Sequence, residues 1–359
     1  MYCSGNSNPT ISCCTIIENT AGSLGSGGGG GIYFSESSSG TVGNCSILNN
    51  AANAGAGLMS ISVGGISIYN STVARNTAWE VAGGMCFKTG PSAVHNCSIF
   101  GNNAAQGGGI QTYADATVEL SSSVLWNNTA ATGPQAAVIR NHTPSSLDVA
   151  YCDVEGGPNN VYIEPGCMLI WGPGNIDADP CFVDPNGPDG DPNTWEDNDY
   201  HLSPNSPCID AGDPNGDYAG QTDIDGQDRT NGVVDMGSDE VWPDVDYALT
   251  LDVRNDGMGY VEIDPEPNDA NQPVYAAGTV VTLLGVPNDG KKLDHWEIYD
   301  PNHPGDANYL AIDSNNPIIV VMDADRDVTA AFKCGSGAGP LLPMTLGALG
   351  LSMWTRRRR

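Results

Sequence analysis

The sequence predicts an all-β protein: a parallel β-helix, then a small β-rich module, then a C-terminal transmembrane or sorting helix. Glycine is abundant, with 46 residues, whereas aromatic residues make up only 7%, and no long run carries helix formers at helical spacing. That composition favours short strands joined by turns. In addition, a motif recurs about every 26 residues in the first half of the chain, and the chain ends in an apolar run followed by four arginines.

The first anchor of the repeat is a hexapeptide that starts with Cys or Ser, has Ile or Val at its third position and ends in Asn. Side chains that alternate inward before a turn are typical of a short strand, and Asn tolerates the left-handed conformation that such a turn needs. We expect the final residues to form one hydrogen-bonded column. They are Asn19, Asn50, Asn76, Asn102 and Asn127, at steps of 31, 26, 26 and 25 residues.

A second anchor keeps the same period: two small residues, usually a glycine pair, precede Ile32, Leu58, Met85 and Ile110. Two anchors with one period predict two or three strands per coil, stacked about 4.8 Å apart. A propeller blade would need about 40 residues, and a sandwich needs antiparallel hairpins, so both are weaker interpretations. We also expect the thiols at the first hexapeptide position to point inward and stay reduced. They belong to Cys14, Cys45 and Cys97.

The alternation of Cys-Ser-Ile-x-x-Asn and Gly-Gly-Gly-Ile, over about residues 10–155, resembles the β-helix proteins of the pectin-lyase-like superfamily. The resemblance implies a right-handed helix, which we assign to residues 1–176, and says little about activity. The first residues have neither the basic start nor the apolar core of a signal peptide, and the chain begins inside the repeat. We therefore expect this β-helix to be N-terminally incomplete, with an export signal upstream.

Residues 177–245 carry the motifs Asp-Pro-Cys-Phe-Val-Asp-Pro (179–185) and Ser-Pro-Cys-Ile-Asp-Ala-Gly (206–212). They resemble the C-terminal end of bacterial surface β-helix proteins of the choice-of-anchor Q group. The resemblance implies that this segment adds the last coils and caps the open end of the solenoid. Cys181 and Cys208 stand where apolar or small residues are common in that group. A disulfide between them and a pair of free thiols both stay open.

Acidic residues are concentrated between 151 and 245, where 21 Asp and Glu face a single Arg. A calcium loop beginning at Asp213 would have Asn215 and Asp217 correctly spaced. However, Tyr218 and Ile224 stand where that loop needs Gly and a carboxylate. Turn-forming, solvated aspartates are therefore the favoured interpretation. We predict no cofactor, with Ca²⁺ the one ion that stays open.

Residues 246–333 form a different unit, in which alternating segments at 247–253, 278–283 and 327–332 read as strands. Together with Gly-Met-Gly-Tyr-Val (257–261) and Leu-Asp-His-Trp (293–296), this order resembles the internalin B-repeat family, small β-rich modules of surface proteins. The resemblance implies a spacer or binding role and no catalysis. We expect Trp296 to lie in the core rather than to form a ligand platform.

Residues 334–359 begin with Cys334, continue through an apolar run from 340 to 354, and end in Arg356, Arg357, Arg358 and Arg359. As a helix, about 20 residues just span the roughly 30 Å of bilayer hydrocarbon, and the arginines would stay in the cytoplasm. The order resembles bacterial C-terminal sorting signals, which implies cutting near Cys334 by a sorting protease. A plain tail anchor stays open. Both interpretations place the protein at the cell surface of a bacterial envelope, with the tail as its membrane contact.

The balance of charge limits the possible partners. A formal net charge of -30, with only three basic residues before residue 150, argues against nucleic acid, because phosphate binding needs clustered Lys and Arg. A hydrolase needs paired carboxylates, and a lyase needs bound Ca²⁺ beside a basic residue. Neither set is evident in residues 1–150, so we predict no catalytic residue. We predict binding, adhesion or structural display towards a polysaccharide or another surface. The alternative is a polysaccharide lyase or glycoside hydrolase of the same superfamily, or its inactive remnant.

Overall fold

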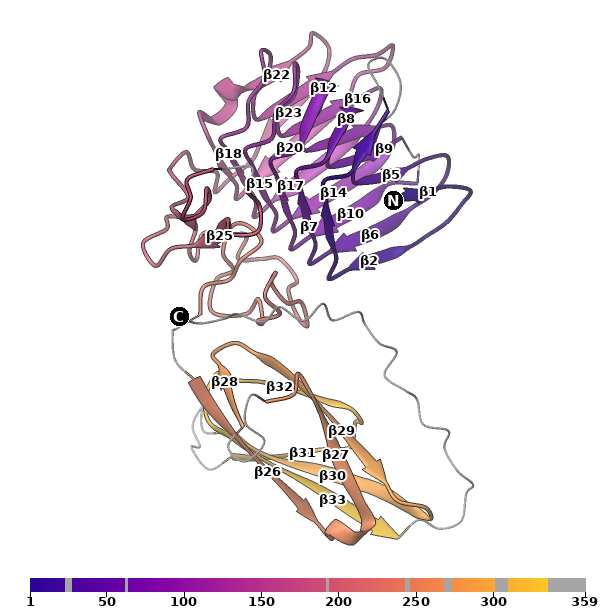
Figure 1. The fold of residues 1–359 in the computed structure, drawn as a ribbon, viewed down its shortest axis with the longest axis vertical. Helices are drawn as coiled ribbons and strands as arrows, with labels where there is room; N and C mark the ends of the chain where they lie inside the picture. The colour runs from indigo at the N-terminus through magenta and orange to yellow at the C-terminus, as the bar shows by residue number, and fades with distance from the viewer. Residues whose placement is uncertain are drawn as a thin grey trace. The chain divides into compact units, whose positions relative to one another are not determined.

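The computed structural model describes residues 1–334 except 23–27, 62–63, 192–193, 243–245, 268–272 and 301–308. The chain forms two units: Met1–Asp225 with Arg229–Val241, and Gly226–Asp228 with the residues from Trp242 onward. Figure 1 shows the first unit as a stack of coils containing strands β1 to β23, with β24 and β25 beside them, and the second as a smaller body containing strands β26 to β33.

The first unit is a parallel β-helix in which successive coils add strands to the same sheets. Sheet A contains β1 (Tyr2–Cys3), β5 (Ile32–Phe34), β9 (Leu58–Ser60), β13 (Met85–Lys88), β16 (Ile110–Tyr113), β19 (Ala136–Ile139) and β22 (Val161–Ile163). Sheet B contains β2 (Thr10–Ser12), β6 (Gly40–Gly43), β10 (Ile66–Tyr69), β14 (Pro91–His95), β17 (Thr117–Ser121), β20 (Ser146–Ala150) and β23 (Met168–Trp171). The predicted β-helix is thereby confirmed.

Two further sheets complete the coils. Sheet C contains β3 (Thr15–Ile17), β7 (Ser46–Leu48), β11 (Thr72–Ala74), β15 (Ser98–Phe100), β18 (Val124–Trp126) and β21 (Asp153–Val154). The short sheet D contains β4 (Thr20–Ala21), β8 (Ala51–Ala54) and β12 (Thr77–Val81). A 3-10 turn, η1 (Gly157–Asn160), joins β21 to β22.

The parallel register stacks like residues on like residues along the inside of the helix. In sheet A, Ile32 pairs with Leu58, Leu58 with Met85 and Met85 with Ile110, as the second anchor predicts. All four side chains are fully buried in one continuous apolar core. Because each coil covers the apolar face of its neighbour, burial repeats with the period of the sequence.

An asparagine ladder runs along the turn that follows sheet C. Asn50 Nδ2 donates to Asn76 Oδ1 at 3.0 Å, and Asn76 donates to Asn102 and Asn102 to Asn128 at the same distance. The ladder begins with Asn19, whose Nδ2 donates to Asn50 Oδ1 at 3.0 Å. Each Oδ1 also accepts the backbone amide of the preceding Asn in the ladder, at 2.9 to 3.0 Å. The buried turn therefore satisfies its own polar groups.

The position expected for Asn127 was wrong by one residue. Strand β18 pairs Leu125, not Val124, with Ile99, so Asn128 completes the ladder and Asn127 lies exposed before it. Asn127 occupies the left-handed position with φ 55°, which in other coils belongs to Glu18, Asn49, Arg75 and Gly101. The ladder position thus needs Asn for its side-chain hydrogen bonds, whereas the residue before it adopts the left-handed conformation of the turn.

The glycine of each second anchor lets the ladder pack against the backbone of the next coil. A Cβ on Gly84 would lie 2.4 Å from Gly109 O, and one on Gly109 would lie 2.6 Å from Gln135 O. At the last coil this column ends in Gln135 itself, whose Oε1 accepts from Asn128 Nδ2 at 2.7 Å. Gln135 Nε2 then donates to Glu155 Oε2 at 2.7 Å, which terminates the ladder.

The cysteines at the first hexapeptide position are free thiols on the inner side of the helix. Cys45 and Cys97 are fully buried, and Cys14, in the first coil, is partly buried. Their sulfurs contact the backbone oxygen two residues earlier, at 3.1 to 3.2 Å. Burial raises the pKa of the Cys45 and Cys97 thiols to about 12. Neutral thiols therefore act here as small apolar residues.

The second unit is built from two sheets around one core. One contains β28 (Val274–Ala276), β26 (Asp246–Arg254), β33 (Arg326–Cys334), β30 (Lys291–Asp300) and β31 (Tyr309–Asp313). The other contains β27 (Gly259–Asp264), β29 (Val280–Pro287) and β32 (Ile318–Val321), and η2 (Asp256–Met258) precedes β27. Trp296 is fully buried, and its Nε1 donates to Asn315 O at 3.0 Å, so its expected place in the core is confirmed.

The C-terminal tail falls largely outside the described residues. Cys334 is described: it is exposed and ends β33, paired with Lys291. The sorting helix expected over 334–359, including Arg356, Arg357, Arg358 and Arg359, otherwise lies beyond that part of the chain. The residues that the structure describes contain no helix long and apolar enough to cross a membrane.

Candidate functional site

Residues 177–241 fold back along the side of the β-helix. In their described part, the only strands are the antiparallel pair β24 (Phe182–Asp184) and β25 (Asp199–Leu202). Asn44, in the turn between sheets B and C, donates through Nδ2 to Thr222 O at 2.8 Å. On the outer face of sheet C, Thr72 Oγ1 lies 2.8 Å from Ser238 Oγ. These contacts lie along the side of the helix, whereas the resemblance implied added coils and a cap at its open end.

Apolar side chains that point out of sheet C explain this placement. Val124 is fully buried although it faces away from the core of the helix, because it packs against Leu202, Cys208 and Met236 of the folded-back segment. Covering such residues removes apolar surface from water, which stabilises the packed arrangement. The segment is thereby held against the helix and can position polar side chains.

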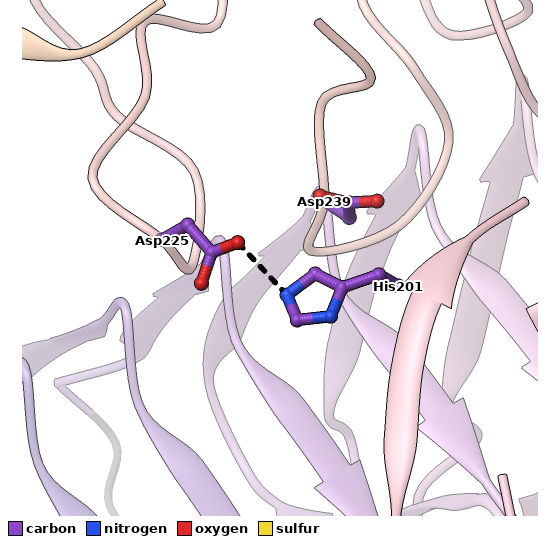
Figure 2. Close-up of side chains that lie close together, drawn as sticks. All are labelled: His201, Asp225 and Asp239. Atoms are coloured by element: carbon purple, nitrogen blue, oxygen red, sulfur yellow. Dashed lines mark ion pairs between the residues drawn. The ribbon is translucent and has the colours of Figure 1, made fainter. Parts of the chain in front are cut away.

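Three side chains from separate parts of the segment converge in a cluster, shown in Figure 2: His201, Asp225 and Asp239. His201 Nε2 lies 3.0 Å from Asp225 Oδ2, and His201 Nδ1 lies 2.5 Å from Asp199 Oδ1. Asp239 is 6% exposed, and its Oδ2 accepts the amide of Leu202 at 2.8 Å. One possible ligand atom from each of His201, Asp225 and Asp239 lies within 4.8 Å of the others.

The charges of this cluster follow from its geometry. Burial alone favours the neutral imidazole, but the hydrogen bonds to Asp199 and Asp225 raise the pKa of His201 to about 11. Burial also raises the pKa of Asp239, against the opposing charge of His201. In this arrangement His201 is an imidazolium held between two carboxylates.

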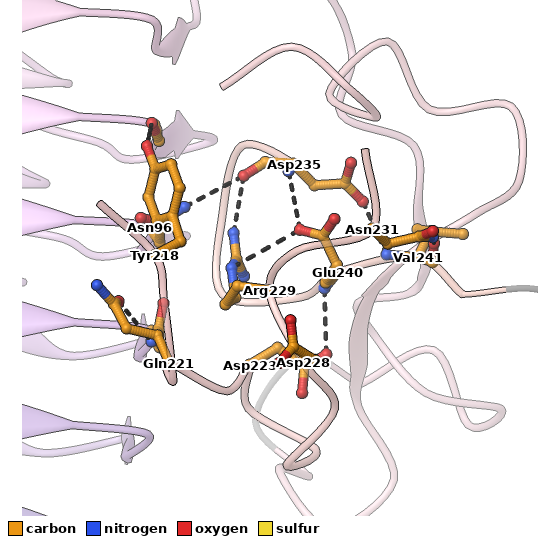
Figure 3. A network of polar contacts seen from close by, with 12 residues as sticks. Asn96, Tyr218, Gln221, Asp223, Asp228, Arg229, Asn231, Asp235, Glu240 and Val241 are labelled. Atoms are coloured by element: carbon orange, nitrogen blue, oxygen red, sulfur yellow. Dashed lines mark hydrogen bonds and ion pairs between the residues drawn. The ribbon is translucent and has the colours of Figure 1, made fainter. Parts of the chain in front are cut away.

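A buried polar network lies in the same segment, centred on Arg229 (Figure 3). Arg229 is fully buried, its Nη2 donates to Asp235 O at 2.8 Å, and its Nε lies 3.7 Å from Glu240 Oε2. Glu240 accepts the Asp235 amide at 2.9 Å, and its own amide donates to Asp223 Oδ2 at 3.2 Å. These contacts join the loops before and after Arg229 into one polar network.

Burial sets the protonation of the acids in this network. It raises the pKa of Glu240 to about 9, with Asp235 adding to the rise and Arg229 opposing it. It raises the pKa of Asp235 to about 6, against the backbone hydrogen bonds from Asp210 and Val241 and the charge of Arg229. The positive charge of Arg229 therefore offsets part of the free-energy cost of burying these carboxyl groups.

A pocket of about 300 Å³ lies between the outer face of sheet C and residues 179–186. Phe100, Trp126 and Phe182 form its apolar wall, and Asn127, Asp179 and Asn186 supply polar groups. Phe182 meets the edge of Phe100 at a ring-centroid distance of 5.3 Å and an angle of 89°.

Arg75 fastens the rim of this pocket. Its guanidinium lies over the Phe100 ring at 4.8 Å, and its Nη2 donates to Asn186 Oδ1 at 2.7 Å and to Pro185 O at 3.1 Å. An aromatic wall beside a polar rim can pack against one face of a sugar ring while the polar groups bind its hydroxyls.

The sequence left open a disulfide between Cys181 and Cys208, and the structure shows two free thiols. Cys208 is fully buried, with Sγ 3.4 Å from Asp153 Oδ2, whereas the Cys181 sulfur contacts Asp179 O at 3.3 Å. Burial, with the nearby Asp153 charge, holds the pKa of Cys208 well above its usual range. Each thiol thus has its own oxygen partner.

Two further constellations, both on sheet B, also escaped the sequence analysis. Glu119 and Asp148 are register partners on neighbouring strands of sheet B, so two carboxylates stand side by side on its outer face. His95 Nδ1 lies 2.6 Å from Ser121 Oγ, and among the described residues no carboxylate bonds to this ring. Both pairs join residues 26 or 29 positions apart, so only the coil period, applied to outward positions, could have revealed them.

Two family models match this chain, one in each unit. The model of the right-handed beta helix region matches residues 1–182, and the model of the divergent InlB B-repeat domain matches residues 249–336. No curated protein and no solved structure matches this chain. The first match covers more than half of the chain and agrees with the stacked parallel sheets and their 26-residue register. The chain therefore belongs to the right-handed β-helix family.

Proposed function

We propose that this protein is a surface-displayed binding protein whose β-helix takes a polysaccharide in the pocket formed by Phe100, Trp126 and Phe182. The observation that carries the proposal is the pocket itself, an aromatic wall beside amide and carboxylate groups. A pyranose has apolar C–H faces and a polar rim, so this combination suits it better than an ion or an extended peptide.

The charge of the protein narrows the ligand class. The chain carries a net charge of -30, and Asp179 lines the pocket. This field repels uronic acids and sulfated sugars. We therefore propose a neutral polysaccharide as the ligand.

Surface display rests on the combination of domains, since a β-helix followed by an InlB-type repeat is consistent with a surface-displayed protein. We propose that the chain lies at the cell surface of a bacterial envelope and that residues 334–359 retain it in the membrane or are cut by a sorting protease. Deleting these residues from the exported protein should move it into the medium, as measured by cell fractionation. Identical fractionation of both forms would contradict the proposed role of residues 334–359 in locating the protein.

Trp126→Ala should weaken polysaccharide binding at least about tenfold, which corresponds to about 1.4 kcal/mol, because it removes one face of the aromatic wall. The control is Trp79→Ala, since Trp79 is a tryptophan of the same β-helix, 39% exposed, that lies on β12 outside the pocket. An array of neutral and acidic polysaccharides identifies a ligand, and calorimetry measures the affinities. Equal affinities of the two variants would contradict the proposed site.

The alternative, a polysaccharide-cleaving enzyme, is favoured by one observation, the register partners Glu119 and Asp148. Adjacent strands place such carboxylates within a few ångströms, close to the separation that retaining glycosidases use. Release of reducing ends from a bound polysaccharide, abolished by Glu119→Gln, would favour this function over binding alone.

A further inference from the structure

We infer that His201, Asp225 and Asp239 form a binding site for a divalent transition metal, with Zn²⁺ as the representative ion. One donor atom from each side chain lies within 4.8 Å of the other two (Figure 2). Shifts of a few tenths of an ångström to an ångström would place all three donor atoms at the roughly 2.0 to 2.2 Å from one central ion that zinc bonds require.

The donor set decides the class of metal. An imidazole nitrogen with two carboxylate oxygens suits Zn²⁺ and its neighbours, which accept nitrogen ligands and four-coordinate geometry. Ca²⁺ takes six to eight oxygen ligands, and here the central donor is His201 Nε2, 3.0 Å from Asp225. The site therefore differs in kind from a calcium loop, and water would supply the fourth ligand.

The second nitrogen of the ring is already positioned as metal sites require. Asp199 Oδ1 lies 2.5 Å from His201 Nδ1, which fixes the ring and directs Nε2 towards Asp225. A carboxylate on the non-ligating nitrogen is the usual outer partner of a metal-binding histidine. Metal binding then replaces the Nε2 proton, which passes to solvent.

A separate observation comes from Asp239. It is 94% buried, since its exposed fraction is 6%, and it accepts the Leu202 amide through Oδ2. Among the described residues no side chain forms an ion pair with it, and Figure 2 shows its carboxylate above the imidazole ring without a direct bond to it. A buried carboxylate that has the imidazolium nearby but forms no direct ion pair with it gains further stabilisation from a bound metal ion.

The proposed ion would join three stretches of the folded-back segment, namely β25, the loop of Asp225 and the loop of Asp239. In its described part this segment has one two-stranded ladder and no disulfide. A metal that bridges such loops adds its binding free energy to their folding. The role of the site is therefore structural: it fixes the segment that forms one wall of the aromatic pocket.

Calorimetric titration of the purified chain with ZnCl₂, together with metal analysis of the dialysed protein, tests the inference. We expect one Zn²⁺ per chain at this site. His201→Ala should weaken its affinity at least about 100-fold, and Asp225→Asn should weaken it at least tenfold. His142→Ala, which removes an exposed histidine elsewhere on the β-helix, should leave it unchanged. Zn²⁺ should also protect residues 177–241 from protease in the wild type but not in His201→Ala.

Other outcomes would overturn the site. Zinc held by exposed thiols such as Cys13 or Cys334 would survive in His201→Ala with unchanged stoichiometry. Absence of saturable zinc binding, or calcium binding that His201→Ala leaves intact, would show that ion pairs alone, and no metal ion, hold this cluster together. Asp225→Asn provides the decisive comparison if His201→Ala does not fold, because the Asp225 side chain is 55% exposed.

Discussion

Replacing Asn76 with alanine should destabilise the β-helix by about 3 to 5 kcal/mol. Asn76 is fully buried, donates to Ile47 O at 2.9 Å and Asn102 Oδ1 at 3.0 Å, and accepts both the amide and the side chain of Asn50. Alanine leaves these groups buried without partners, and each costs about 1 to 3 kcal/mol. Because the ladder is continuous, the loss should extend to the neighbouring coils.

Asn127→Gly is the matched control for this variant. Asn127 is exposed, contributes no side chain to the ladder and has φ 55°, which glycine adopts without strain. Its effect on the free energy of unfolding should stay within about 0.5 kcal/mol. Denaturant unfolding measures both variants, and hydrogen exchange at the Asn50 amide reports the ladder directly. Similar losses in the two variants would refute the assignment of Asn128, rather than Asn127, to the ladder.

Arg229→Met should cost about 3 to 5 kcal/mol of the stability of the segment folded against sheet C. Methionine fills a similar volume but removes the only arginine or lysine of residues 151–245, and so leaves Asp235 and Glu240 buried without the neighbouring guanidinium. Losing one partner of a buried ion pair is costly for this reason. Arg140→Met, which removes an exposed guanidinium, should change stability little. Hydrogen exchange of residues 205–241 locates the effect.

The same variant should show a signature in its pH dependence. The folded pKa of Asp235, about 6, lies above its ordinary value of 3.8. This carboxyl therefore contributes stability that is complete below about pH 4 and is lost as pH rises through 6. Arg229 lowers that pKa, so its removal should hurt more at pH 8, where Asp235 would be ionised, than at pH 5. A deficit that is equal at both pH values would show that lost packing, and not lost charge, causes the destabilisation.

The sequence alone was enough to predict the coils of the β-helix, because each coil repeats one short motif. An inward apolar residue, an Asn three positions later and a glycine at the next corner recur with one period, and parallel stacking turns that period directly into columns. The residues at Ile32, Leu58, Met85 and Ile110 pair as their spacing predicts. The core position of Trp296 was also expected, from the large apolar surface of its aromatic side chain.

The register of one coil could not be read from local pattern. Residues 121–123 are all serine and residues 127–128 are both Asn, so the hexapeptide fits in two ways that differ by one residue. Both Val124 and Leu125 are buried, and they face opposite sides of the strand. Periodicity fails here because a strand covered on both faces loses its alternation.

The placement of residues 177–241, and with it the aromatic pocket and the His201 cluster, was decided only by tertiary structure. Asn44 meets Thr222 across 178 positions, and His201 meets Asp225 and Asp239 through loops that share no repeat. Apolar residues on the outer face of sheet C offered no local sign that another segment would cover them. The coils are specified by neighbours one period apart, whereas this segment is held by the burial of non-repeating side chains over long separations, which a single sequence does not encode as a pattern.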